Sequence, residues 1–146
     1  MPLRTKRPAL RLEVPSETRF LGLVRDVTCT MAEVAGFEEK TASELALAVD
    51  EAASNVLEHA YAGAPGRVVA VEMDDTGESF CVDVCDDGLA FDPATLPALD
   101  VRHLEKERRT GGLGVHLMEK IMDEVTFERS PPWNACCLVK RKRPER

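Results

Sequence analysis

The sequence of 146 residues predicts an α+β fold, a two-layer sandwich in which three helices cover one face of a mixed, mostly antiparallel five-stranded sheet. Three observations support this prediction. The elements expected along the chain follow the order β-α-α-β-β-α-β-β. Two pairs of strands are consecutive and separated by turn residues, which favours hairpins, and the helical segments carry apolar stripes. The length fits one domain with a single core, so we expect residues 1–146 to form one unit.

The first half of the chain contains one predicted strand and two predicted helices. Residues 9–14 alternate apolar and polar side chains, which is typical of a strand. Ser16 is a suitable N-cap for a helix that ends near Gly36. A second helix is expected from about Thr41 to Tyr61. Apolar residues recur at three- and four-residue steps in both helices, in the first at Phe20, Leu23, Val24, Val27, Met31 and Val34, in the second at Leu45, Ala48, Val49, Ala52, Val56 and Ala60.

The second half adds two predicted hairpins and a third helix. Residues 67–74 and 79–86 read as strands joined by a turn at 75–77 that ends in glycine. Residues 113–125 have the pattern of a short helix. Residues 125–130 and 135–142 then read as two strands joined by a Pro-Pro turn. Between the first hairpin and the helix, residues 87–112 show little periodicity, and a segment of this length is usually a lid or a binding loop.

Composition places the chain among ordinary globular proteins. The hydrophobic fraction is 44% and the charged fraction is 31%. No apolar run approaches the roughly 20 residues of a membrane span, and no long apolar segment follows the basic N-terminus, so we expect a cytoplasmic protein without a secretory signal. The cysteines are five in number and form no CxxC pair, which favours buried thiols over disulfides or a zinc site: Cys29, Cys81, Cys85, Cys136 and Cys137.

Charge is distributed unevenly. The net charge is −7, and because residues 1–12 and residues 140–146 each carry +4, the segment 13–139 carries −15. Such an acidic body repels nucleic acid and favours a basic protein partner or a ligand bridged by a cation. We therefore expect no direct nucleic-acid partner and no membrane association. The basic tail, residues 140–146, is either a solubilising end or an interaction arm.

A row of polar residues lies on the second predicted helix. Glu51, Asn55 and His59 follow one another at four-residue steps and occupy one side of the helix, beside its apolar stripe. Asn55 offers a neutral oxygen, which suits a hard cation, and Glu51 is placed to accept a proton from a nearby hydroxyl or water. His59 is expected to bond locally. On its own the row also fits a solvated helix face.

The end of the third predicted strand, residues 79–86, is the second candidate site. Asp86 ends the strand of residues 79–86, and Gly88 follows closely. A carboxylate at this place can accept a hydrogen bond from the amino group of a flat ligand, and the glycine lets backbone come near that ligand. The alternative is a polar turn that closes the strand.

A glycine-rich segment is the third candidate site. Gly111, Gly112 and Gly114 stand at the start of the third predicted helix, with Arg108 and Arg109 before them. Backbone N–H groups at a helix N-terminus attract anions, and glycines let a phosphate approach. A glycine-rich turn alone is weak support. The three segments together predict a nucleotide site that lacks a Walker lysine.

These segments resemble the boxes of the histidine-kinase-like ATPase (GHKL) superfamily, whose domain has the Bergerat fold. The N box corresponds to EAASNVLEHAY (51–61), the first glycine box to DDGLAFDP (86–93), and the second to RTGGLGVHLMEKIMDEVTFE (109–128). Within the superfamily the sequence is most similar to bacterial anti-sigma-factor serine/threonine kinases. The resemblance covers nearly the whole chain, since the order of helices and strands also fits.

The resemblance implies ATP and Mg²⁺ as cofactors and gives each matching residue a role. Asn55 would hold Mg²⁺, Glu51 would orient or deprotonate the attacking hydroxyl, and Asp86 would bond the adenine amino group. The ATP lid would span about residues 90–112. The remaining nucleotide-binding positions would be Gly88, Ala90, Arg109, Thr110, Gly111, Gly112, Leu113 and Gly114. Ala90 is a departure, because the family often has glycine there, and it bears on lid geometry rather than on nucleotide binding.

The resemblance also implies partners. The expected substrate is a serine of an anti-anti-sigma (STAS-type) protein, the regulated partner is a sigma factor or another regulator, and the kinase is expected to be a homodimer. The alternative is a nucleotide-gated switch that sequesters its partner without significant transfer; an intact Glu51 favours the kinase. A detached histidine-kinase catalytic domain is less favoured, because no phosphoacceptor helix is seen before the first predicted strand.

Overall fold

The computed structural model describes residues 7–90 and 112–143 of the chain. Five strands form one sheet: β1 (Leu10–Pro15), β2 (Val68–Asp75), β3 (Ser79–Asp86), β4 (Glu124–Ser130) and β5 (Trp133–Arg141). Their order in the sheet is β1-β2-β3-β5-β4, and each of the four neighbouring pairs is antiparallel. The predicted α+β sandwich is confirmed, with no parallel pair among these strands.

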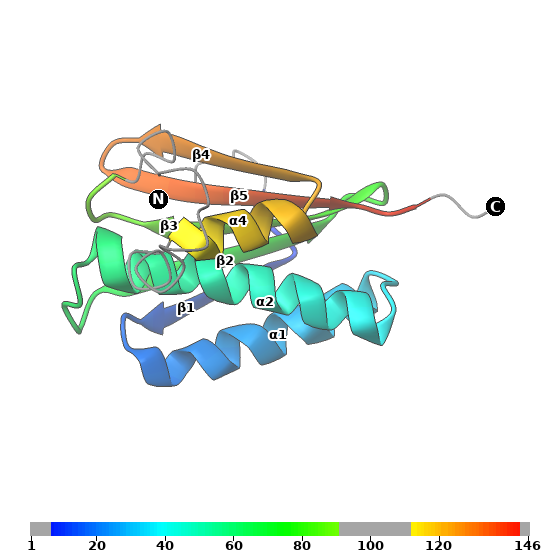
Figure 1. Ribbon diagram of the computed structural model, residues 1–146, viewed down its shortest axis with the longest axis horizontal. Helices are drawn as coiled ribbons and strands as arrows, with labels where there is room; N and C mark the ends of the chain where they lie inside the picture. Colours follow the sequence, from blue (N-terminus) through cyan, green and yellow to red (C-terminus); the bar gives the residue numbers. More distant parts are fainter. Residues whose placement is uncertain (1–6, 91–111, 144–146) are drawn as a thin grey trace.

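Three helices cover one face of this sheet (Figure 1). They are α1 (Leu21–Val34), α2 (Glu39–Asn55) and α4 (Gly112–Ile121). A short 3-10 turn, η1 (Thr18–Phe20), precedes α1, and a π-helical segment, η2 (Val56–Ala60), continues α2. Within the described residues, no helix is both long enough and apolar enough to cross a membrane.

Helix α2 lies between α1 and α4 and packs against both. Its buried positions are mostly small, which lets the neighbouring helices approach closely: Ala42, Leu45, Ala46, Ala48, Val49, Ala52 and Ala53. The sheet contributes alternate residues to the same core, because side chains on a strand point to opposite faces in turn: Val69, Val71, Met73, Phe80, Val82, Val84 and Leu138. This core holds α2 firmly beside the ends of β3 and β5.

The cysteines behave as the sequence predicts. All five thiols are free; four are buried and Cys29 is half-buried. Burial raises the pKa of the Cys85 and Cys136 thiols to about 12, so both remain protonated and poorly reactive at neutral pH. These residues serve as small packing groups on the two faces of the sheet.

Several predicted boundaries differ from the structure. The third helix ends at Ile121 instead of 125, because Val125 already belongs to β4 and pairs with Leu138. An apolar residue at a helix-to-strand junction fits both patterns, which is why periodicity did not separate them. The predicted helix 41–61 begins at Glu39 and changes to π geometry at Val56.

Candidate functional site: a cavity between α2 and the sheet

The junction between α2 and η2 fixes the first site residues. Asn55 is the last residue of α2, and the wider π turn begins at Val56. Isolated π turns within helices occur frequently at functional sites. Glu51 and Asn55 are about one turn apart on α2 and share a helix face. His59 lies in η2, and its place in the predicted row stays a prediction.

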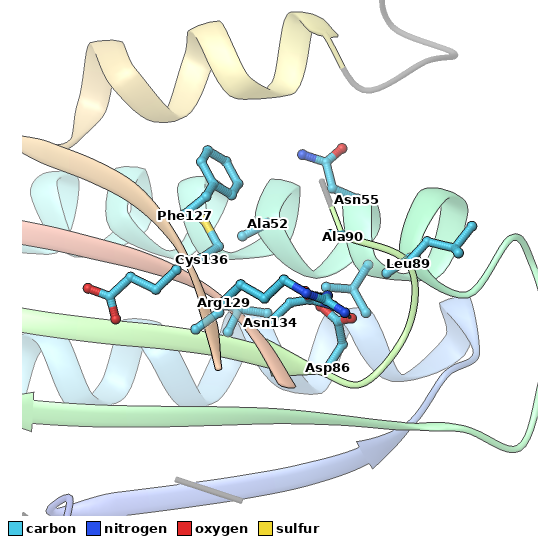
Figure 2. Close-up of a pocket in the computed structure, with 14 residues that line it drawn as sticks. Ala52, Asn55, Asp86, Leu89, Ala90, Phe127, Arg129, Asn134 and Cys136 are labelled. Atoms are coloured by element: carbon cyan, nitrogen blue, oxygen red, sulfur yellow. Dashed lines mark hydrogen bonds between the residues drawn. The ribbon is translucent and has the colours of Figure 1, made fainter. Parts of the chain in front are cut away.

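A cavity lies between α2 and the ends of β3, β4 and β5 (Figure 2). Its empty volume, including the part that is open to solvent, is about 570 Å³. Asn55, Asp86 and Ala90 line it, so the structure brings residues from two of the predicted segments together. Much of the remaining wall is apolar: Ala52, Val56, Val84, Leu89, Phe127 and Cys136. A flat, largely apolar ligand with a few polar groups fits such a wall.

Asp86 forms the polar floor of the cavity. Its side chain is buried, and its Oδ1 atom accepts hydrogen bonds from the Gly88 N–H at 2.8 Å and from Asn134 Nδ2 at 2.9 Å. Burial raises the pKa of Asp86, whereas the bonds from Asn134 and Gly88 act in the opposite direction. Both of these bonds are made to Oδ1, so a ligand in the cavity would meet the carboxylate through Oδ2.

Gly88 is required by the protein itself. A Cβ atom built on Gly88 would lie 2.2 Å from the carbonyl oxygen of Ala60, at the end of η2. The neighbouring Leu89 N–H donates to the same oxygen at 2.9 Å. The sequence predicts that this glycine lets a ligand come close; in the structure it permits the close approach of η2. The turn after β3 and the end of η2 are thereby joined.

Asp87 faces a different set of partners from Asp86. Arg67 Nη2 donates to Asp87 Oδ1 at 2.8 Å, and the Asp87 N–H donates to the Tyr61 hydroxyl at 3.2 Å. The Arg67 guanidinium also stacks over the Tyr61 ring at 4.7 Å. Arg67 holds the pKa of Asp87 below its usual value, so this carboxylate stays ionised in a structural cluster. Of the two adjacent acids, only Asp86 lines the cavity.

Glu51 lies against the first turn of α4. A Cβ atom built on Gly114 would be 2.5 Å from Glu51 Oε2, so the carboxylate occupies the space that a side chain at 114 would fill. Gly112 begins α4, as the glycine-rich pattern predicts. The structure thus brings Glu51 beside the N-terminus of α4, where the helix dipole favours negative charge. Leu113 belongs to the same turn.

Several predicted site positions fall outside the described residues. Arg109, Thr110 and Gly111 belong to this group, together with most of the proposed lid, about 90–112. Their roles stay predictions.

Asn55 carries a buried polar atom whose missing hydrogen-bond partner indicates a place for a ligand. The residue is 8% exposed, and its Nδ2 atom has no hydrogen-bond partner within the described part of the chain. Leaving such a group unsatisfied costs about 1–3 kcal/mol. Figure 2 shows the amide on the α4 side of the cavity, away from Asp86. A ligand that reaches from Asp86 to Asn55 would meet polar groups at both ends.

The site also fits a magnesium ion that arrives with its ligand. An amide oxygen, presented by rotation of the Asn55 side chain, is a suitable hard donor. Among residues 7–90 and 112–143, no group of three or more histidine, cysteine or acidic side chains could hold a metal. Mg²⁺ usually takes one or two protein ligands and fills its shell with phosphate oxygens and water, so the donor set is appropriate for Mg²⁺ bound with phosphates.

Sequence reasoning missed the residues that β4 and β5 contribute. Phe127, Arg129, Asn134 and Cys136 all line the cavity. Their role depends on β5 pairing with β3, in a register that places Asn134 opposite Asp86. The only available signal was Asn134, a polar residue immediately before an apolar strand.

Comparisons with known proteins agree with this geometry. A family described as "Histidine kinase-like ATPase domain" matches residues 14–140. The chain is 31% identical over 127 residues to a protein named serine-protein kinase RsbW from Listeria monocytogenes, covering 84% of this chain and 81% of the relative. It is 29% identical over 123 residues to the protein of that name from Bacillus subtilis, covering 82% and 77%.

Solved structures share the fold. The structure of the RsbU and RsbW domains of Rv1364c from Mycobacterium tuberculosis aligns with a TM-score of 0.59 at 21% identity, over 95% of this chain and 34% of that one. A blue-light activated histidine kinase, EL346 from Erythrobacter litoralis, aligns with a TM-score of 0.53 at 19% identity, over 85% and 41%.

Proposed function

Because this chain belongs to the histidine kinase-like ATPase domain family, we propose that it is an ATP-dependent protein serine kinase that acts as an anti-sigma factor in partner switching. Its substrate would be a serine on an anti-anti-sigma (STAS-type) protein, and its regulated partner a sigma factor or a related regulator. We expect a homodimer. The relatives named serine-protein kinase RsbW support the kinase class.

The observation that carries the proposal is the cavity with Asp86 at one end and Asn55 at the other. The Oδ2 atom of Asp86 can accept a hydrogen bond from the adenine amino group, while apolar side chains contact the base. Asn55 lies toward α4, so the phosphates would point to the N-terminus of that helix, whose N–H groups favour anions. No Walker lysine is needed in this arrangement.

Glu51 is the residue that we assign to the chemical step. It lies one turn before Asn55 on α2 and beside Gly114 on α4. In our proposal the serine oxygen of the substrate forms a bond to the γ-phosphorus of ATP, while Glu51 accepts the proton of the serine hydroxyl. The bond between the γ-phosphorus and the β–γ bridging oxygen breaks, and ADP is released. Mg²⁺ held by Asn55 would neutralise phosphate charge. Positioning and charge neutralisation account for most of the catalysis in such transfers.

The proposal is tested by copurification from the native host followed by transfer of label from γ-labelled ATP. The expected result is label on a serine of a copurifying partner. Binding of ATP without any transfer would instead support the nucleotide-gated switch, in which the same fold only sequesters its partner. Label on histidine would contradict both of these functions.

Asn55→Ala should weaken binding of Mg·ATP by about tenfold or more, about 1.4 kcal/mol, because a cation ligand is lost. Without nucleotide, the melting temperature should stay the same or rise, since the variant removes an unsatisfied buried amide. Titration calorimetry with and without Mg²⁺ measures the first effect. The half-buried Ser54→Ala, one residue away, is the matched control. Unchanged Mg·ATP affinity in Asn55→Ala would contradict the assigned role.

A further inference from the structure

The side-chain amide of Asn134 is buried next to Asp86, and its hydrogen bonds fix its orientation. Asn134 is 8% exposed and stands at the start of β5. Its Nδ2 atom donates to Asp86 Oδ1 at 2.9 Å and to the carbonyl oxygen of Gly88 at 3.0 Å, which uses both of its hydrogens. Its Oδ1 atom accepts from Arg129 Nη1. Figure 2 shows the three side chains of Arg129, Asn134 and Asp86 grouped at one end of the cavity.

Arg129 determines which atom of the Asn134 amide faces Asp86. A guanidinium only donates hydrogen bonds, so the amide oxygen must face Arg129 and the amide nitrogen must face Asp86. Asp86 Oδ1 then receives two N–H donors, from Asn134 and from Gly88. Donors at this oxygen favour the ionised carboxylate. As a result, Asp86 presents Oδ2 to the cavity as a hydrogen-bond acceptor.

Asp86 needs this support because its surroundings otherwise favour the neutral acid. Burial is the largest influence and raises its pKa, and the neighbouring carboxylate of Asp87 acts in the same direction. The bonds from Asn134 and Gly88 lower the pKa, as does the positive charge of Arg129. A neutral carboxyl group could donate a hydrogen bond to a ligand, whereas the carboxylate can only accept one.

We propose that Asn134, oriented by Arg129, is a positioning residue that sets nucleobase selectivity: it keeps Asp86 an acceptor, so that the cavity binds 6-aminopurines and rejects 6-oxopurines. The inference rests on the proposed function, since it concerns the base of the bound nucleotide. A 6-aminopurine offers an N–H donor to Asp86 Oδ2. A 6-oxopurine instead presents its oxygen, a hydrogen-bond acceptor, to Asp86 Oδ2. Two buried acceptors that face each other receive no hydrogen bond, and this lowers the affinity.

The test compares ATP with inosine triphosphate, which carries an oxygen in place of the 6-amino group. Binding of each with Mg²⁺ is measured by calorimetry on the full chain. Asn134→Asp keeps the shape of the side chain but sets a carboxylate against Asp86, and two adjacent carboxylates retain a proton between them. We expect wild type to prefer ATP by at least about 100-fold and the variant to lose at least about tenfold of that preference.

Two further variants separate selectivity from folding. Arg129→Met removes the donor that orients the amide, at an exposed position of β4, and should also reduce the preference for ATP. Thr126→Asp introduces the same side chain as Asn134→Asp at another exposed position of β4, away from Asp86, and should keep the wild-type ratio. If Asn134 and Arg129 had only a structural role, their variants would lower the affinities for ATP and for inosine triphosphate together and leave the ratio of the two unchanged.

The outcomes distinguish this inference from the proposed function. If wild type binds ATP and both Asn134→Asp and Arg129→Met keep the wild-type ratio of affinities, the selectivity role of Asn134 is wrong while the nucleotide site stands. If wild type binds neither nucleotide, the proposed function itself is wrong. A reduced ratio in Arg129→Met supports the inference even where Asn134→Asp fails to fold.

Discussion

Glu51→Gln is expected to lower the rate of phosphoryl transfer by about 10²–10⁴-fold, the usual contribution of one acid–base group, while ATP affinity stays close to that of wild type. The glutamine keeps the shape that fits beside Gly114 but cannot accept the serine proton. Glu51 is absent from the lining of the nucleotide cavity, so its loss should not disturb the base. Single-turnover transfer and calorimetry measure the two quantities separately.

The control for this prediction is Glu44→Gln, an exposed glutamate on the same helix. It removes the same charge away from the cavity and should transfer phosphate at the wild-type rate. An equal loss of ATP affinity in Glu51→Gln would show that Glu51 binds the nucleotide instead of acting on the hydroxyl. An unchanged transfer rate would remove Glu51 from the mechanism altogether.

Gly88→Ala should have the largest effect on the nucleotide site. The new Cβ would lie 2.2 Å from the oxygen and 2.6 Å from the carbon of the Ala60 carbonyl, and both are backbone atoms. The turn after β3 or the end of η2 must therefore shift. Overpacking of this kind costs about 1–3 kcal/mol of the free energy of unfolding. Since Gly88 donates to Asp86, we also expect ATP affinity to fall by more than about tenfold, or about 1.4 kcal/mol.

Gly22→Ala is the matched control and should have the opposite sign. Gly22 lies in α1, and a Cβ there would meet only the end of the flexible Arg25 side chain, at 3.6 Å. Alanine in a helix is more favourable than glycine by about 1 kcal/mol. Chemical denaturation measures both variants. If Gly88→Ala were as stable as wild type and bound ATP normally, the close packing of the turn against η2 would be unimportant.

The elements of the fold were predictable because local patterns specify them. Alternation in residues 10–15, the largely apolar run of residues 80–85 and the apolar stripe of α2 are each typical of a strand or helix that buries apolar side chains. The π turn after Asn55 was not predictable, because VLEHA has no feature that separates a π turn from a continued α-helix. In the structure, the end of η2 packs closely against the turn at Gly88, a contact that the local sequence does not reveal.

The site was predictable only in part, for a related reason. Glu51, Asn55 and Asp86 stand in recognisable segments, and the structure places Asn55 and Asp86 in one cavity and Glu51 beside α4. Asn134 and Arg129 act through a strand pairing between distant parts of the chain, β3 with β5. Nothing local in the sequence fixes that register, so their contact with Asp86 appears only in three dimensions.

The central claim is that a magnesium nucleotide binds between α2 and the sheet, with its base on Asp86 and its phosphates toward Asn55 and α4. Calorimetry of the full chain with millimolar ATP and Mg²⁺, paired with a thermal melt, tests it most directly. We predict measurable heat of binding and a higher melting temperature, since a ligand that binds only the folded state stabilises it by mass action. No heat and no change in melting temperature would contradict the account.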